Sequence, residues 1–496
     1  MVAQTGAMVL DDDVCFRALA ARDHRFDGQF FVGVVTTGIY CRPVCPARTP
    51  LRRNVRFYRS AATAAAAGLR ACRRCRPDTL PGSREWDHRS DLVARALRLL
   101  GSGAADATGV EPVADALHVS SRHLNRALMA EVGVTAGQVA RTRRAQTARL
   151  LLEHTDLPAT EVAYAAGFRT VRQFNDVIRQ EFGVTPTGLR GGRRHSDGRV
   201  ATADTVTVRL GFRPPYAVAS VLGWFARHAV AGVDEVTDAA ITTTLLDGTR
   251  VGARFEASSV VVSLGLPPHG DVRDLPPVIA AVRRWLDLDA TPARIDDHFA
   301  GIAPVAAWVQ RRPGMRVPAA ADPFRSVVGT IMGQQVSVGA AATLNARLIA
   351  HCGLTDRFPT AETLAACDAD VLAHAVGIPA TRARTLVTVA ELVAGGGVEL
   401  GPSADRDFSV ATLGSVKGVG PWTVAEVRMR ALGDPDVWPA GDLILRRALQ
   451  PGGLVAGLDP AAAAPWRSYL AHHVWIGHGE RHNRHQNQKR KQQERE

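Results

Sequence analysis

The apolar and polar positions of this chain change their spacing at two points. From about Ser90 to Arg190 the apolar residues recur at helical intervals, which predicts a helical region. Residues 205–265 alternate between apolar and polar side chains instead, as strands do. Helical spacing returns from Pro323 to about Gly479. The strands are expected at Thr205–Leu210, Ile241–Leu246 and Val260–Leu264.

Turn-forming residues mark where these regions meet. A Pro/Gly cluster at Pro77–Ser83 and a glycine-rich polar segment at Gly191–Gly198 predict linkers. The last stretch, Arg481–Glu496, is basic and lacks apolar periodicity, so we expect a disordered tail. A chain of 496 residues has room for three or four domains of about 100–200 residues each.

Charge and hydropathy narrow the class of partner. The net charge is +12, which favours a polyanion such as nucleic acid, although charge alone does not distinguish specific binding from non-specific attraction. No apolar run reaches the roughly 18 residues of a membrane span, and the N-terminus has no signal pattern. We therefore expect a cytoplasmic protein.

Four of the seven cysteines fall in one short region. Cys41 and Cys45 are separated by three residues, and Cys72 and Cys75 by two, with 26 residues between the pairs. Two close pairs from separate turns can supply four sulfur ligands to Zn²⁺. The spacing alone favours a purely structural zinc site.

The residues around these cysteines add a reactive alternative. Phe30–Cys45 (FFVGVVTTGIYCRPVC), Asn54–Tyr58 and Ala71–Asp78 resemble the N-terminal domain of the Ada family. The resemblance implies that Cys41 irreversibly accepts a methyl group from a methylphosphotriester in DNA, while all four cysteines hold one zinc ion. It also implies DNA contacts by Thr37, Arg48 and Arg70.

The middle of the chain contains two helix–turn–helix patterns. Pro112–Leu128 and Thr160–Arg179 each read as two helices around a tight turn, with Ser120 or Ser121 and Gly167 at the turns. Together they resemble the AraC-type DNA-binding domain. The residues suited to base edges and phosphates are Arg122, Asn125, Arg126, Arg172, Gln173 and Asn175. For any one of them, a solvated helix face is an equally good interpretation.

Two motifs in the last third carry further chemistry. Leu413–Thr423 (LGSVKGVGPWT) places Gly418 and Gly420 at a bend between helices, where N–H groups can approach a phosphate, with a bridging monovalent cation as an option. Asp442 follows 19 positions after Thr423 and opens a helix. By that cue alone Asp442 is more often only a helix cap.

Together these motifs resemble the helix-hairpin-helix glycosylases, and among them the AlkA type, 3-methyladenine DNA glycosylase II. The resemblance spans about residues 205–479 and assigns Asp442 as the carboxylate that stabilises the sugar cation. Thr423 stands where bifunctional relatives carry lysine, so no strand-cleaving lyase activity is expected. Gln335 occupies the position of a leucine that fills the gap in the duplex. The expected base pocket consists of Trp224, Trp422 and Trp475, for each of which a core role is the alternative.

These expectations define a multidomain fold. It combines a small α+β zinc domain, an all-α AraC-type double helix-turn-helix domain, an α+β glycosylase N-terminal domain and an all-α helix-hairpin-helix domain. The expected boundaries are 1–85, 86–192, 203–318, 319–479 and a tail at 480–496. No Pro-Cys-His-Arg tetrapeptide is present, so we expect no O6-methylguanine repair.

The function expected from these resemblances is that of a transcriptional activator and alkylation-repair enzyme. It would bind double-stranded DNA, contact RNA polymerase as an activator, transfer methyl groups to Cys41 and hydrolyse the glycosidic bond of 3-methyladenine, 7-methylguanine and similar bases. The alternative is a DNA-binding regulator with an inactive glycosylase half.

Overall fold

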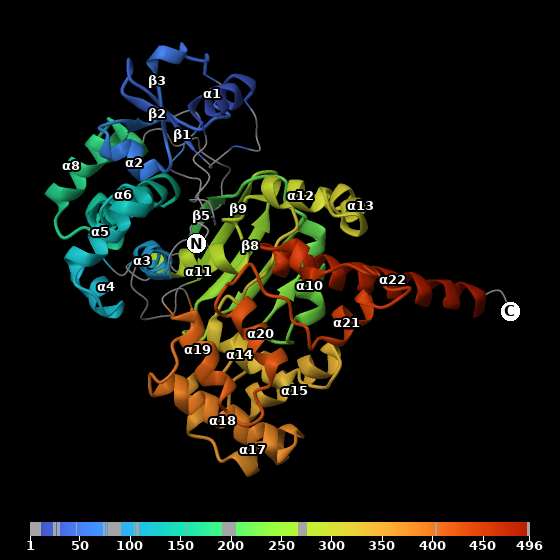
Figure 1. The fold of residues 1–496 in the computed structure, drawn as a ribbon. Helices are drawn as coiled ribbons and strands as arrows, with labels where there is room; N and C mark the ends of the chain where they lie inside the picture. The colour runs from blue at the N-terminus through green and yellow to red at the C-terminus, as the bar shows by residue number, and fades with distance from the viewer. Residues whose placement is uncertain are drawn as a thin grey trace, which may run out of the picture. The chain divides into compact units, whose positions relative to one another are not determined.

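The computed structural model of the chain describes most of its length, and Figure 1 shows its helices and strands. The described residues are 11–22, 26, 30–45, 47–72, 75, 77, 91–103, 105, 109–155, 157–190, 205–265, 275–401 and 404–493. Most of the two expected linkers, 77–83 and 191–198, therefore lies outside them. Contacts divide the chain into two compact units, residues 1–199 and the remainder, apart from two short segments.

The first unit begins with a small sheet of strand order β3-β1-β2-β4. β1 pairs antiparallel with β2, with Val32 opposite Cys41, and β2 pairs parallel with β4. Asp11 caps the first helix and a Ser60–Thr63 capping box begins the second. The elements are α1 (Asp12–Ala21), β1 (Phe31–Val34), β2 (Ile39–Cys41), η2 (Arg52–Asn54), β3 (Val55–Tyr58), α2 (Ala61–Ala66) and β4 (Arg70–Ala71).

Within the described residues, seven helices complete the first unit. They are α3 (Asp91–Ser102), α4 (Glu111–Ala116), α5 (Ser121–Val132), α6 (Ala136–His154), α7 (Ala159–Ala165), α8 (Val171–Phe182) and α9 (Pro186–Arg190). Ser120 caps α5 by accepting from the His123 amide, and Thr170 caps α8 in the same way through Gln173. Gly167 turns the chain between α7 and α8 at φ 85°. Both expected helix–turn–helix patterns are confirmed.

The second unit opens with a five-stranded sheet of order β5-β9-β8-β7-β6. Its strands are β5 (Thr205–Gly211), β6 (Glu235–Val236), β7 (Ala240–Thr244), β8 (Arg250–Phe255) and β9 (Ser259–Gly265). The three expected strands correspond to β5, β7 and β9. The sheet is accompanied by α10 (Val218–His228), α11 (Leu275–Trp285), α12 (Pro292–Ala300) and α13 (Ala303–Arg311).

The rest of the second unit is helical and has two apolar cores. One core lies among α14, α15, α17 and α18, and the other joins α12, α13, α21 and α22. The helices are α14 (Pro323–Met332), α15 (Val338–His351), α16 (Ala361–Ala365), α17 (Ala369–Val376), α18 (Ala380–Ala394), α19 (Arg406–Gly414), α20 (Pro421–Arg430), α21 (Leu443–Leu449), η5 (Pro460–Ala463) and α22 (Arg467–Gln493).

The end of the chain differs from the sequence-based expectation. We expected no regular structure after Gly479, yet α22 continues through Gln493. A helix that begins in a buried core can extend over polar residues because each added residue continues the hydrogen-bond ladder of an existing nucleus. Among the helices in the described ranges, none is long and apolar enough to cross a membrane.

Candidate functional sites

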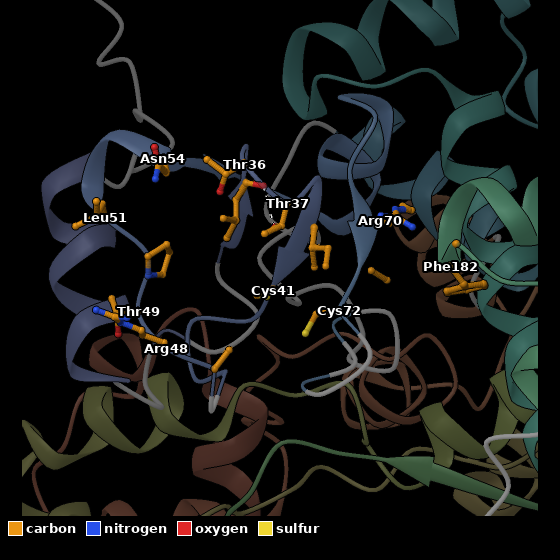
Figure 2. Close-up of a pocket in the computed structure, with 16 residues that line it drawn as sticks. Thr36, Thr37, Cys41, Arg48, Thr49, Leu51, Asn54, Arg70, Cys72 and Phe182 are labelled. Atoms are coloured by element: carbon orange, nitrogen blue, oxygen red, sulfur yellow. Dashed lines mark hydrogen bonds between the residues drawn. The ribbon is translucent and has the colours of Figure 1, made fainter.

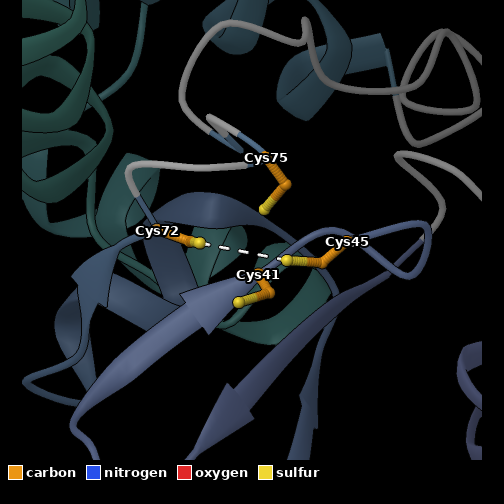
Figure 3. Close-up of side chains that lie close together, drawn as sticks. All are labelled: Cys41, Cys45, Cys72 and Cys75. Carbon is orange, nitrogen blue, oxygen red and sulfur yellow. Dashed lines mark hydrogen bonds between the residues drawn. The ribbon is translucent and has the colours of Figure 1, made fainter. Parts of the chain in front are cut away.

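Four cysteine sulfurs converge in the first unit. Cys41 lies at the end of β2, Cys45 follows in the next turn, and Cys72 and Cys75 follow β4. Their Sγ atoms all lie within 4.8 Å of one another, and all four residues are buried (Figure 3). The Cys45 and Cys72 sulfurs are 3.9 Å apart. The predicted ligand set is therefore assembled in space.

The chemistry of this cluster fits a zinc ion. The neighbouring thiols raise the pKa of Cys41 and lower that of Cys72, because so tight a group of thiols has to share its protons. Four buried thiolates without a cation would repel one another strongly. A divalent ion in tetrahedral coordination would remove that repulsion, and four-cysteine sites usually bind such an ion.

The four sulfurs differ in their hydrogen bonds. The Arg42 amide donates to Cys75 Sγ at 3.3 Å. An N–H donor withdraws electron density from a thiolate, so this bond makes the Cys75 sulfur less nucleophilic.

Cys41 also borders a cavity of about 840 Å³. Thr37, Arg48 and Arg70, the three expected DNA contacts of this domain, line the same cavity, with Arg48 and Arg70 on opposite sides of Cys41 (Figure 2). Thr36, Thr49 and Asn54 line it as well. Sequence reasoning missed these three residues, since nothing in their spacing distinguishes them from ordinary loop residues.

Replacing Cys72 by serine should abolish metal binding and unfold the first domain. Small zinc modules derive much of their folding free energy, about 10–16 kcal/mol, from the metal. Metal analysis should find one zinc per wild-type chain and none in the variant, with loss of structure by circular dichroism. Cys15→Ser, which removes a buried thiol outside the cluster, is the control. Full zinc retention in Cys72→Ser would contradict the ligand assignment.

The expected DNA-contact residues of the helical domain lie on the second helix of each motif. In α5, Arg122 and Arg126 are exposed, while Asn125 is half-buried and accepts a hydrogen bond from the Ala136 amide at 2.9 Å. In α8, the corresponding residues are Arg172 and Gln173, which are exposed, and Asn175, which is half-buried. Asn125 thus has a structural role that sequence reasoning did not foresee.

The glycine hairpin between α19 and α20 is held closely against α18. Gly418 has a φ of 96°, and a Cβ at this position would lie 2.2 Å from Thr385 Oγ1. Both facts require glycine. Gly420 is the N-cap residue of α20, and a Cβ there would meet nothing within 4 Å. The amides of this bend are therefore carried at the start of a helix, where anions are favoured.

Gln334 ties this hairpin to the end of α14. Its side-chain amide donates to Gly418 O and to Thr423 Oγ1, both at 2.9 Å. The next residue, Gln335, is exposed and has a φ of 57°, a rare conformation for a residue with a side chain. The turn after α14 that carries Gln335 is thus fixed beside the hairpin. Sequence reasoning missed Gln334, because its partners are 84 and 89 positions away.

Asp442 is the N-cap of α21, and it makes a second contact. Its Oδ1 accepts from the Leu445 amide at 2.9 Å and from Trp475 Nε1 at 3.1 Å. Both bonds use the same oxygen. The carboxylate is only partly exposed. A cap with a buried indole as second donor is oriented more strongly than an ordinary surface cap.

Two of the three expected pocket tryptophans pack together. The Trp224 and Trp475 rings are 5.5 Å apart, and His228 stacks on Trp224 at 4.1 Å. Trp422 packs against Gly441, the residue before Asp442, where a Cβ would lie 3.1 Å from Trp422 Cβ. Trp475 is therefore bonded directly to Asp442, Trp224 packs on Trp475, and the start of the Trp422 side chain lies beside the residue that precedes Asp442.

Family models match the chain in four consecutive segments. They are the metal binding domain of Ada at residues 14–78, a helix-turn-helix domain at 113–192, the AlkA N-terminal domain at 207–322 and an HhH-GPD superfamily base excision DNA repair protein at 328–462. The Ada-type zinc domain, the helix-turn-helix domain and the two segments of the AlkA-type glycosylase that were inferred from the sequence are thus present in the inferred order.

Curated relatives show the same combination. The Escherichia coli bifunctional transcriptional activator/DNA repair enzyme Ada is 35% identical over 40% of this chain and 54% of its own length. The E. coli DNA-3-methyladenine glycosylase 2 is 30% identical over 54% of this chain and 97% of its own length. A probable bifunctional transcriptional activator/DNA repair enzyme AlkA of Mycobacterium tuberculosis is 42% identical over 94% of this chain and 96% of its own length. The chain therefore belongs to the family of bifunctional transcriptional activator/DNA repair enzymes that join an Ada-type metal-binding domain and a helix-turn-helix domain to an AlkA-type glycosylase.

Proposed function

We propose that this protein repairs alkylated DNA at two separate sites and reports one of the two repairs to transcription. The observation that carries the proposal is Cys41 itself. It belongs to a four-cysteine cluster and borders a cavity lined by Thr37, Arg48 and Arg70. These features suit a nucleophile that meets a phosphate group.

At the first site, Cys41 takes a methyl group from a methylphosphotriester. The sulfur attacks the methyl carbon, an S–C bond forms, the O–C bond breaks, and the phosphate leaves as an ordinary phosphodiester anion. A zinc ion held by the four cysteines would keep the Cys41 sulfur ionised at neutral pH. Arg48 and Arg70 would hold the flanking phosphates, and Thr37 would donate a hydrogen bond.

The charge of the site changes in this reaction. Four thiolates around one divalent ion leave two net negative charges, which repel unmodified phosphodiesters but not a neutral triester. A methyl group on Cys41 removes one of these charges. Binding to unmodified promoter DNA is then less opposed, which makes the site an electrostatic switch.

Methylation should therefore strengthen promoter binding. The protein is incubated with DNA that carries methylphosphotriesters, mass spectrometry locates one added methyl group on Cys41, and the dissociation constant for unmodified promoter DNA is measured over a salt series. We expect a lower dissociation constant, with a gain that shrinks as salt rises. Equal affinities after stoichiometric methylation would refute the switch, and a methyl on Cys45 would refute the choice of thiolate.

At the second site, Asp442 promotes hydrolysis of the glycosidic bond of alkylated bases such as 3-methyladenine and 7-methylguanine. Alkylation makes the base cationic and a good leaving group, so one carboxylate suffices to stabilise the sugar cation and guide water. The base has to leave the stack first. Trp224, Trp422 and Trp475 would hold it through stacking and cation–π attraction, and Gln335 would fill the gap. Thr423 provides no amine for a lyase reaction.

The proposal includes further assignments. The domains extend over 1–85, 86–192, 203–318 and 319–479. The protein acts in the cytoplasm, where the DNA is. Gly418 and Gly420 bind a backbone phosphate, with a monovalent cation as bridge, and RNA polymerase is the partner of the activator. The DNA contacts of the helix-turn-helix motifs are Arg122, Asn125, Arg126, Arg172, Gln173 and Asn175. The contact of Asp442 with a buried indole supports an active glycosylase half over an inactive one.

A further inference from the structure

An arginine lies among the aromatic rings of the second site. The Arg430 guanidinium carbon is 4.5 Å from the ring centroid of Trp224 and 5.5 Å from that of Trp475. Both distances are within the range of cation–π attraction. A positive charge of the protein itself therefore occupies part of the aromatic surface near Asp442.

This guanidinium is fixed by further contacts. Its Nε donates to Glu426 Oε2 at 2.9 Å, and its Nη1 donates to the Pro318 carbonyl at 3.1 Å. Its Nη2 lies 3.4 Å from Nε2 of His472, which is fully buried. The side chains of Arg430 and Glu426 are only 14% and 9% exposed. A planar fork held at three nitrogens has very little freedom to rotate.

The position of Trp475 depends on these neighbours. Arg430 lies over the Trp475 ring, while His472 packs edge-on against it at 5.2 Å and 86°. The Trp475 N–H donates to Asp442 Oδ1 at 3.1 Å. A tilt of the indole would move this N–H and release the carboxylate, because hydrogen bonds weaken steeply with angle.

The charge of Arg430 has a second consequence. A cationic alkylated base that stacks near these indoles would be repelled by an unbalanced guanidinium. Glu426 supplies the opposite charge at hydrogen-bond distance. Burial raises the pKa of Glu426, and the adjacent Arg430 opposes part of that shift.

We propose that Arg430 is a positioning residue that orients Trp475 and thereby Asp442, and that Glu426 determines specificity by cancelling the charge of Arg430 so that cationic bases are accepted. The inference rests on the proposed role of Asp442. It adds two residues, Arg430 and Glu426, that direct the same reaction without contacting the sugar.

A double-mutant cycle tests the positioning role. In the full-length protein, Arg430→Met should lower the single-turnover rate of 3-methyladenine excision about tenfold, which corresponds to about 1.4 kcal/mol. In the Asp442→Asn background the same change should have little further effect, because the group that it positions is gone. Arg428→Met is the matched control, since Arg428 lies on the same helix and pairs with Asp434 and Asp407 instead.

The outcomes separate the two hypotheses. Wild-type activity in Asp442→Asn alone would refute the proposed role of Asp442. An impaired Asp442→Asn together with equal Arg430→Met losses in both backgrounds would refute the positioning role and leave Asp442 in place. If Arg430→Met does not fold because Glu426 is left unpaired, Glu426→Gln/Arg430→Met carries no unpaired charge and takes its place in the cycle.

Binding to two lesions tests the role of Glu426. Duplexes with cationic 7-methylguanine or uncharged hypoxanthine are bound to Asp442→Asn protein, which leaves the bases in place, with and without Glu426→Gln. The preference for the cationic base should fall about tenfold in Glu426→Gln, a size that nearby unit charges can exert. Equal weakening for both bases, or no change in the preference, would refute the specificity role.

Discussion

Replacing Asp442 by asparagine should slow the excision of 3-methyladenine by about 10²–10³, the usual effect of removing one preorganised electrostatic group. Asparagine has nearly the same shape and can still accept from the Leu445 amide and from Trp475 Nε1, so folding should hardly change. It lacks the negative charge that faces the developing sugar cation. Single-turnover excision kinetics, with DNA binding measured in parallel, provide the check.

Controls separate the charge from the helix cap. Asp368 caps α17 in the same way, by accepting from the amides of Asp370 and Val371, and Asp368→Asn should leave excision unchanged. Abasic sites made by the wild type should stay uncleaved until alkali or heat is applied, because Thr423 has no amine. Wild-type turnover in Asp442→Asn would show that Asp442 is a cap and no more.

Cys41→Ser should abolish methyl transfer while glycosylase activity persists. A serine hydroxyl is not ionised under these conditions and is a poor nucleophile towards a methyl carbon. The glycosylase residues lie in the other compact unit, so they should be unaffected. The measurement is mass spectrometry after incubation with methylated DNA, combined with an excision assay on the same sample.

Cys15→Ser is the matched control for this variant. Burial, reinforced by Asp12 and Asp11, raises the pKa of Cys15 to about 11, so this thiol is not ionised at neutral pH and should accept no methyl group. Cys15→Ser should therefore transfer methyl groups like the wild type. A methyl group found on the Cys41→Ser protein would show that another cysteine is the acceptor.

Local sequence signals predicted much of the fold. Ser120 was foreseen as a possible cap and Gly167 as a turn, because capping and positive φ depend on residue type at one position. The sheet strands β5, β7 and β9 followed from alternation, whereas the two-residue strand β6 is too short to show a period. The basic tail was assigned to disorder because its composition is polar, and the helix that enters it was not visible in that composition.

In the candidate sites, too, the residues that are close together in the sequence were predictable. Cys41 and Cys45 are separated by only three residues, and the two glycines of the hairpin are separated by one. The partners of these groups are distant in sequence. Trp475 is 33 positions from Asp442, and His472 is 42 from Arg430. Only tertiary packing brings such pairs together, so no periodicity could have indicated them.

The proposed methyl acceptor is a single residue, Cys41, of a four-cysteine cluster, and this limits how many alkylation events one molecule can register. In the proposed reaction nothing removes the methyl group from Cys41, so each chain would record a single event, whereas Asp442 would be regenerated after each turnover. A chain that is already methylated at Cys41 would therefore remain active as a glycosylase. The dose that a cell can register is set by its stock of unmethylated chains, and the record fades only through new synthesis and dilution at division.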